Sequence, residues 1–142
     1  MHRKENSGFF SIDALLALTL LLVITTSLLH LYEDRRKSAE ALGTGLEAKM
    51  IGNRLASAIN AVYVNGPNFR VEIKLPENVE DHKYRIFSDN SVGLLTVEIS
   101  SGETVETKIA CRNFKNFVLE FENLGKKIEI FWEESQICVV SQ

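Results

Sequence analysis

Side chains that could do chemistry are sparse in this chain and form no recognisable catalytic or metal-binding motif. The three histidines have no ligand spacing, and no glycine-rich phosphate loop or nucleophile motif occurs. Glu133 and Glu134 adjoin Trp132, but two carboxylates between strand-like segments are more typical of a solvated turn. We therefore expect no enzymatic activity, no metal and no cofactor. The histidines are His2, His30 and His82.

The two cysteines, Cys111 and Cys138, lie in strand-like segments of the last third of the chain. If this part lies outside the cell, they could form one disulfide. Alternatively they are two small buried side chains that never meet. Because a disulfide needs Cα atoms within bonding range, both interpretations stay open at the level of sequence.

One carboxylate, Asp13, stands at the start of a long apolar run. Residues 14–32 read ALLALTLLLVITTSLLHLY and contain no Asp, Glu, Lys or Arg. A bilayer core about 30 Å thick needs roughly 20 helical residues, and this run with residues 9–12 is long enough. An Asp near the centre of such a helix costs about 2.5–3.5 kcal/mol and less toward its end. Acids in this position are usually retained for a partner.

Three interpretations of the apolar run compete. It could be a secretory signal cut near residues 25–27, although that cut leaves leucines at the new terminus. It could be an uncleaved signal anchor. It could also be cut between Gly8 and Phe9, which would create an α-amino group one helical turn from Asp13. That positive charge could pair with Asp13 of a neighbouring subunit. The third interpretation therefore also explains why an acid stands in an apolar segment.

The residues around this cut resemble a known family. Gly8-Phe9 followed by Asp13, in the sequence GFFSIDALLAL, is similar to the class III signal peptide of type IV prepilins and related archaeal pilin-like proteins. The resemblance implies that a membrane prepilin peptidase cuts after Gly8 and that Phe9 becomes the first mature residue. It also implies that Phe9 and Asp13 act in subunit assembly, with the apolar helices packed into a filament core. Residues 59–76 resemble the helix-to-sheet junction of archaeal pilin-like proteins.

Charge gives information about partners and orientation. The net charge of −3 argues against a nucleic-acid partner, because phosphate binding needs a clustered excess of Lys and Arg. The one dense basic cluster, Arg35, Arg36 and Lys37, follows the apolar run and is typical of a membrane-flanking anchor. The basic residues on both flanks leave orientation open by charge alone. The resemblance favours a cytoplasmic N-terminus.

The rest of the chain predicts an α+β fold with a type IV pilin-like layout. Residues 1–8 would be the leader, 9–32 the transmembrane and filament-core helix, 33–66 its amphipathic continuation, and 67–142 an antiparallel sheet domain. Asn65-Gly66-Pro67 is a helix stop. We expect the following apolar residues, spaced by three and four, to face the sheet: Leu42, Leu46, Met50, Ile51, Leu55, Ile59, Val62 and Tyr63.

After Pro67 the apolar period changes to two, which predicts strands joined by short turns in an antiparallel meander. The helix would cover its apolar face. The expected strands are residues 71–75, 83–88, 92–99, 104–110, 117–122, 127–132 and 137–140.

These features favour a structural subunit, major or minor, of a type IV pilus-like filament. The subunit would be anchored in the cell membrane before assembly and lie at the cell surface afterwards, with other pilin subunits as partners. The alternative is an uncleaved, membrane-tethered extracellular binding module, which has no use for Asp13. A pseudopilin or archaellum-like component would share the same signature. A surface aromatic patch for adhesion is a further alternative to a buried role for the aromatic residues near the C-terminus.

Overall fold

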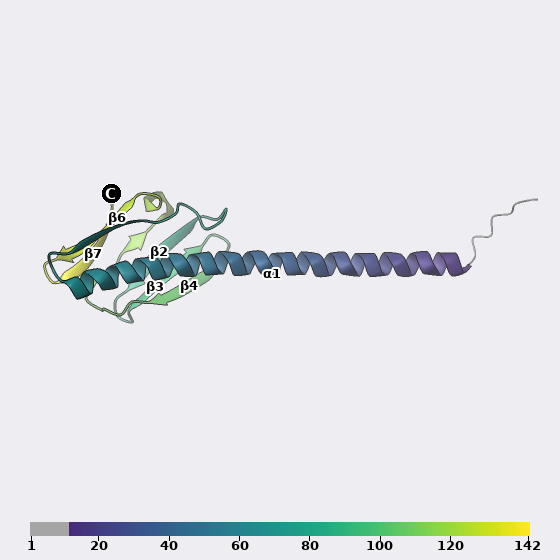
Figure 1. The fold of residues 1–142 in the computed structure, drawn as a ribbon, viewed down its shortest axis with the longest axis horizontal. Helices are drawn as coiled ribbons and strands as arrows, with labels where there is room; N and C mark the ends of the chain where they lie inside the picture. The colour runs from purple at the N-terminus through teal and green to yellow at the C-terminus, as the bar shows by residue number, and fades with distance from the viewer. Residues whose placement is uncertain (1–11) are drawn as a thin grey trace, which may run out of the picture. The chain divides into compact units, whose positions relative to one another are not determined.

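A computed structural model describes residues 12–142 of the chain (Figure 1). The fold is α+β, with one 54-residue helix, α1 (Ile12–Asn65), packed against C-terminal antiparallel sheets. The chain divides into two compact units, of which the first ends at Glu40 and the second is Ala41–Gln142. We call the second the head unit. The strands are β1 (Arg70–Lys74), β2 (Tyr84–Asp89), β3 (Leu94–Ile99), β4 (Thr104–Lys108), β5 (Val118–Leu119), β6 (Lys127–Glu133) and β7 (Gln136–Ser141).

The C-terminal end of α1 is built as the sequence predicts. Gly66 has a φ of 87°, a left-handed conformation that glycine adopts without steric cost, and its amide donates to the carbonyl of Val62 over 3.1 Å. Pro67 then prevents continuation. The Asn65 amide also donates to the carbonyl of Ala61, so the last turn is closed by side chain as well as backbone.

The strands form two antiparallel sheets where the sequence predicted a single meander. One sheet has the order β1-β6-β7 and the other β4-β3-β2-β5. The local hairpins were predictable from their turns, but β1 pairs with β6, which lies far along the chain, with Val71 opposite Ile130. The expected strand 117–122 is only β5, followed by a short 3-10 helix, η1 (Phe121–Asn123).

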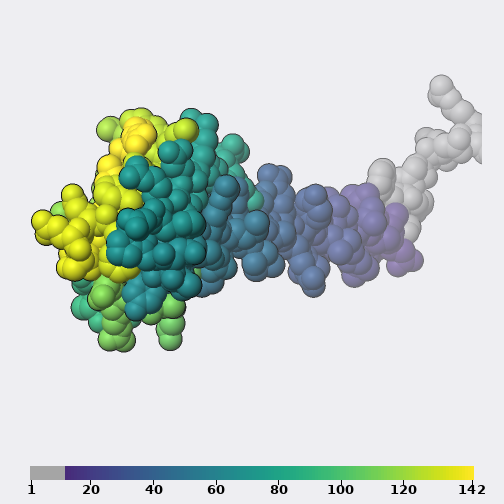
Figure 2. Space-filling view, turned by 60° about the vertical axis from the view of Figure 1, so that its left-hand side comes forward, coloured from purple at the N-terminus to yellow at the C-terminus, as the bar shows by residue number. Residues whose placement is uncertain are grey.

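The hydrophobic core lies between the helix and the inner faces of the sheets. Alternation along β3 buries the side chains of Leu95, Val97 and Ile99. Alternation along β6 likewise buries those of Ile128 and Ile130. The largest helix side chains that are fully buried are Leu55, Ile59 and Val62. In the space-filling view the teal second half of α1 lies at the surface beside the yellow C-terminal strands (Figure 2).

The prediction of which helix residues face the sheets was wrong in part. Leu42, Leu46 and Met50 are 66%, 58% and 70% exposed and do not face the sheets, and Tyr63 is also exposed. Ile51, Leu55, Ile59 and Val62 are buried as expected. The missing part of the inward face consists of small residues, which let the helix approach the strands closely. These small residues are Thr44, Ala48, Gly52, Ala56 and Ala58.

Candidate membrane and assembly segment

The first part of α1 makes no contact that buries its side chains. Every residue from 12 to 40 is exposed, including twelve large apolar side chains of the run that begins at Ile12 and ends at Leu31. This segment is long and apolar enough to cross a membrane. Exposure of so much apolar surface to water is strongly unfavourable. The segment is therefore suited to a membrane anchor or to a signal sequence.

The hydroxyl groups in this segment are satisfied inside the helix. Each hydroxyl donates to the carbonyl of the residue four positions earlier, so it needs no hydrogen bond from water or from another chain. A lipid environment therefore leaves none of these four hydroxyls unpaired. The pairs are Thr19 with Leu15, Thr25 with Leu21 at 2.7 Å, Thr26 with Leu22 at 2.7 Å, and Ser27 with Val23 at 2.8 Å.

Asp13 lies in the first turn of α1 as the structure describes it. Its side chain is exposed, next to apolar residues that are exposed as well. The predicted processing residues Gly8 and Phe9 lie outside the described residues, and the pairing of the Phe9 α-amino group with Asp13 stays a prediction.

The basic cluster after the apolar run lies on exposed helix surface. Arg36 pairs with Glu40 one turn later at 2.8 Å, and the hydrogen bond to that carboxylate raises the pKa of Arg36. Arg35 and Lys37 are exposed on the same stretch of helix. An exposed pair of this kind adds little stability, so the cluster is available to interact with polar or anionic surroundings.

The two cysteines are both free thiols, and each is buried. Cys111 belongs to the hydrophobic core. Cys138 lies on the other face of β7 from its core neighbours Ile137 and Val139, and its thiol donates to a carboxylate oxygen of Glu133 over 3.1 Å. Burial raises the pKa of both thiols. In this structure both cysteines are therefore buried free thiols, and a disulfide between Cys111 and Cys138 stays a prediction.

The other residues considered in the sequence occupy structural positions. Glu134 has a φ of 55° and lies in the tight turn between β6 and β7, as a solvated turn would. Trp132 donates its indole N–H to the carbonyl of Val62 over 3.0 Å and stacks on Tyr63 with ring centroids 6.2 Å apart. It thereby fastens the end of α1 to the sheet. Among residues 12–142, no group of three His, Cys, Asp or Glu side chains is placed to hold a metal ion.

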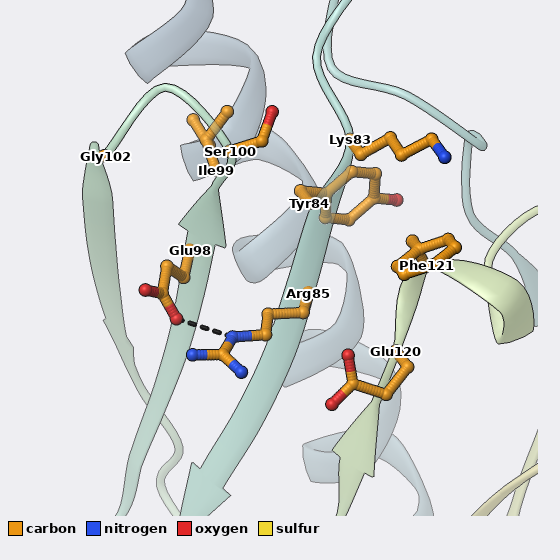
Figure 3. A pocket seen from close by; sticks show the side chains of 9 residues that line it. All are labelled: Lys83, Tyr84, Arg85, Glu98, Ile99, Ser100, Gly102, Glu120 and Phe121. Atoms are coloured by element: carbon orange, nitrogen blue, oxygen red, sulfur yellow. Dashed lines mark hydrogen bonds and ion pairs between the residues drawn. The ribbon is translucent and has the colours of Figure 1, made fainter.

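The head unit has a shallow pocket of about 260 Å³ beside the start of β2 (Figure 3). Lys83 places its ammonium group 4.5 Å from the ring centre of Phe121. Arg85 pairs with Glu98 of β3 at 2.6 Å, and burial raises the pKa of Tyr84. Lys83, Arg85 and Glu98 are thus engaged with partners already present. Sequence patterns did not single them out, because only the pairing of β2 with β3 and with β5 brings them together.

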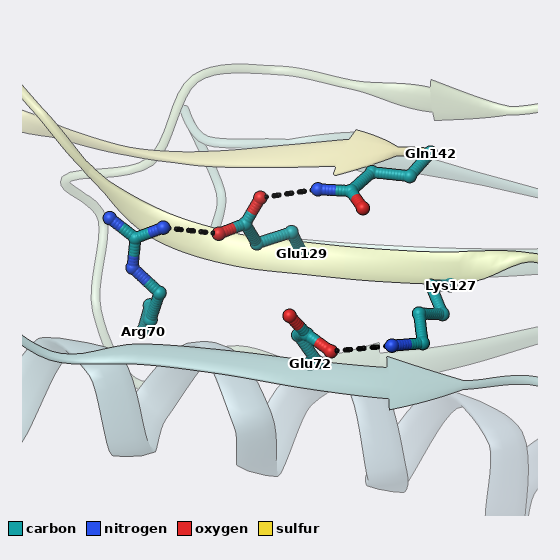
Figure 4. Close-up of polar contacts among 5 residues, drawn as sticks. All are labelled: Arg70, Glu72, Lys127, Glu129 and Gln142. Atoms are coloured by element: carbon teal, nitrogen blue, oxygen red, sulfur yellow. Dashed lines mark hydrogen bonds and ion pairs between the residues drawn. The ribbon is translucent and has the colours of Figure 1, made fainter.

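The outer face of the three-stranded sheet carries a ladder of polar contacts (Figure 4). Arg70 contacts Glu129 at 2.8 Å, Lys127 contacts Glu72 at 3.1 Å, and the Gln142 amide donates to the second oxygen of Glu129. Diagonal opposite charges of this kind stabilise a sheet modestly. They make most of this face polar, although Val140, opposite Glu129 on β7, is 46% exposed.

A long N-terminal apolar helix packed on antiparallel sheets is a pilin-like architecture. The likeness rests on this layout alone, because comparison with known proteins identified no relative. No protein-family model, no curated protein and no solved structure matches the chain.

Proposed function

We propose that the chain is a structural subunit, major or minor, of a type IV pilus-like cell-surface filament. It would be inserted as a membrane precursor, cut after Gly8 by a prepilin peptidase, and assembled with other pilin subunits through its apolar helix. The observation that carries the proposal is the exposed apolar segment of α1 joined to a head with its own core. That segment needs either lipid or other helices around it.

Asp13 is the specific support for assembly over simple anchoring. A lone carboxylate at the edge of an apolar segment weakens membrane insertion, and a tether gains nothing from it. In an assembly, Asp13 would pair with the α-amino group of Phe9 on a neighbouring subunit. That ion pair would form away from water, where opposite charges interact more strongly than at a surface.

A structural role also agrees with the chemistry of the head. Within the described residues of the head, ion pairs link neighbouring strands, as in the Arg85–Glu98 pair and the Arg70–Glu129 pair. We propose no reaction for it and no nucleic-acid partner. In this account the head is the surface that the assembled filament presents outside the cell.

The proposal is tested by replacing Asp13 in cells that assemble filaments. Asp13→Leu should remain at normal levels in the membrane fraction but be strongly depleted from sheared filaments, as measured by immunoblot. Asp13→Glu keeps the charge and is the matched control, so it should enter filaments. If Asp13→Leu enters filaments as well as the wild type does, the assembly role is wrong and a membrane-tethered binding module becomes the better account.

A further inference from the structure

The first turns of α1 in the head unit contain two glycines close together. Gly43 and Gly45 flank Thr44, and they follow soon after Glu40, the last residue of the first compact unit. A glycine within a helix lowers its stability relative to alanine, and glycines are frequent where helices bend. The hydrophobic core contains no residue of α1 before Ala48. This stretch of α1 therefore depends on other contacts for its rigidity.

One residue of the loop between β1 and β2, Glu80, makes such contacts. Its carboxylate oxygen Oε2 accepts a hydrogen bond from the Thr44 hydroxyl over 2.9 Å, and its amide donates to Glu47 Oε2 over 3.0 Å. A Cβ atom at Gly43 would lie 2.9 Å from Glu80 Oε1, so Gly43 leaves the space that the carboxylate occupies. Glu80 therefore contacts α1 before and after Gly45, through its side chain and its backbone.

The backbone of the loop holds Glu80 in place. The preceding residue, Val79, is fully buried and exchanges two backbone hydrogen bonds of 2.9 Å with His82. Glu80 itself has a φ of 51°, a left-handed conformation that favours glycine. A residue with a side chain keeps such a conformation only where the surrounding structure holds it. The contact of the carboxylate with α1 gives a reason for glutamate in a position that suits glycine.

We propose that Glu80 is a latch that keeps residues 43–47 helical, and that its release turns residues 43–45 into a hinge within α1. With the latch closed, the helix enters the head as a rigid rod. With the latch open, the turn that contains Gly43 and Gly45 unwinds or bends transiently. All of these contacts lie within the head unit, so the latch does not depend on the proposed function.

The latch can open while the core of the head stays intact. It consists of two hydrogen bonds made by an exposed loop residue, whereas Ala48 and Ile51 of the next helical turns are buried in the core. Segments with few buried apolar contacts open locally at a lower free energy than the whole domain unfolds. Opening is therefore confined to the helical turns before Ala48.

Hydrogen exchange of the full chain in detergent, followed by mass spectrometry, tests the latch. Glu80→Gly removes the carboxylate but suits the left-handed backbone, so the urea midpoint of the head should change little. Amides of residues 43–47 should nevertheless exchange about fivefold faster, as expected when one hydrogen bond is lost. Glu80→Gln keeps an acceptor oxygen and is the matched control, so its exchange should resemble that of the wild type.

Two results would overturn the latch. One is unchanged exchange of residues 43–47 in Glu80→Gly. The other is an equal acceleration in β3, because that would show a general loss of stability and not a local opening.

Gly45→Ala tests whether the glycines form the hinge. A Cβ atom at Gly45 would meet no atom within 4 Å, so alanine strengthens the helix there without touching the loop. Added to Glu80→Gly, it should return the exchange of residues 43–47 close to the wild-type rate. If the double variant exchanges as fast as Glu80→Gly alone, the glycines are not the hinge and the proposal fails.

Discussion

The contact between Gly52 of α1 and Thr107 of β4 gives the sharpest test of how the helix packs. A Cβ atom added at Gly52 would lie 2.7 Å from Thr107 Oγ1 and 3.5 Å from a methyl group of Val97. Thr107 is buried, and its hydroxyl has no hydrogen-bond partner among the described residues. Its short, branched side chain has little freedom to move away. Gly52→Ala should therefore push the helix off the sheet.

The expected magnitude follows from two opposing effects. Alanine in place of glycine stabilises a helix by about 1 kcal/mol. Overpacking a well-packed core costs about 1–3 kcal/mol. We expect Gly52→Ala to lower the free energy of unfolding of the head by about 1–2 kcal/mol, since the closest atom is held in a strand. Gly45→Ala makes the same change in open space and should raise it by about 0.5–1 kcal/mol.

The assay is urea unfolding of the full chain in detergent, followed by the fluorescence of Trp132. This is the only tryptophan, and its hydrogen bond to Val62 makes it a reporter of helix docking in the head. Thr107→Ala should restore much of the stability lost in Gly52→Ala, because it removes the obstructing atom. If Gly52→Ala stabilises the head as much as Gly45→Ala does, the close helix–sheet approach is refuted.

Three further predictions concern other parts of the head. Trp132→Phe should lower the free energy of unfolding by about 1 kcal/mol or more, because the carbonyl of Val62 loses the indole donor; circular dichroism in urea would measure this. The hydroxyl and amide of Ser91 hold the pKa of Asp89 below its ordinary value of 3.8, so its contribution to stability is present above about pH 4 and is lost as pH falls below it. The urea midpoint of Asp89→Asn should therefore change less between about pH 6 and pH 3 than that of the wild type. Both cysteine thiols should react slowly with Ellman's reagent in the native protein and fully in non-reducing denaturant, because both are free and buried; a single reactive thiol or none would contradict this.

Much of the fold could be predicted from local pattern. The helix stop at Asn65-Gly66-Pro67 is a local signal, and the structure has Gly66 in the left-handed conformation expected of it. The hairpins of β2 with β3 and of β6 with β7 follow from alternation and short turns. In these elements the deciding interactions join residues close in sequence, so the sequence alone contains the information.

Two features depended on contacts that no local pattern reveals. Periodicity identified the helix but not its full inward face, because Gly52 and Ala48 pack inward for reasons of size, while Leu46 and Met50 face outward. The pairing of β1 with β6 joins distant segments, and it divides the strands into two sheets. In both cases tertiary packing, and not the hydrophobic pattern of a single segment, decides which residues and strands come together.

The candidate assembly site was derived almost wholly from the sequence. The apolar segment and Asp13 were identifiable by composition, and the structure adds that this segment finds no burial within the chain. The pairing of Phe9 with Asp13 depends on a second subunit and on residues outside the described range. It therefore stays a prediction for experiment.

The N-terminal residue of the protein tests the central claim most directly. The measurement is mass spectrometry of the protein purified from its native membrane or cell surface, in cells that have the prepilin peptidase. The account predicts a chain that begins at Phe9. A chain that still begins at Met1 would contradict prepilin-type processing, and the protein would then be better described as a membrane-tethered module with Asp13 unexplained.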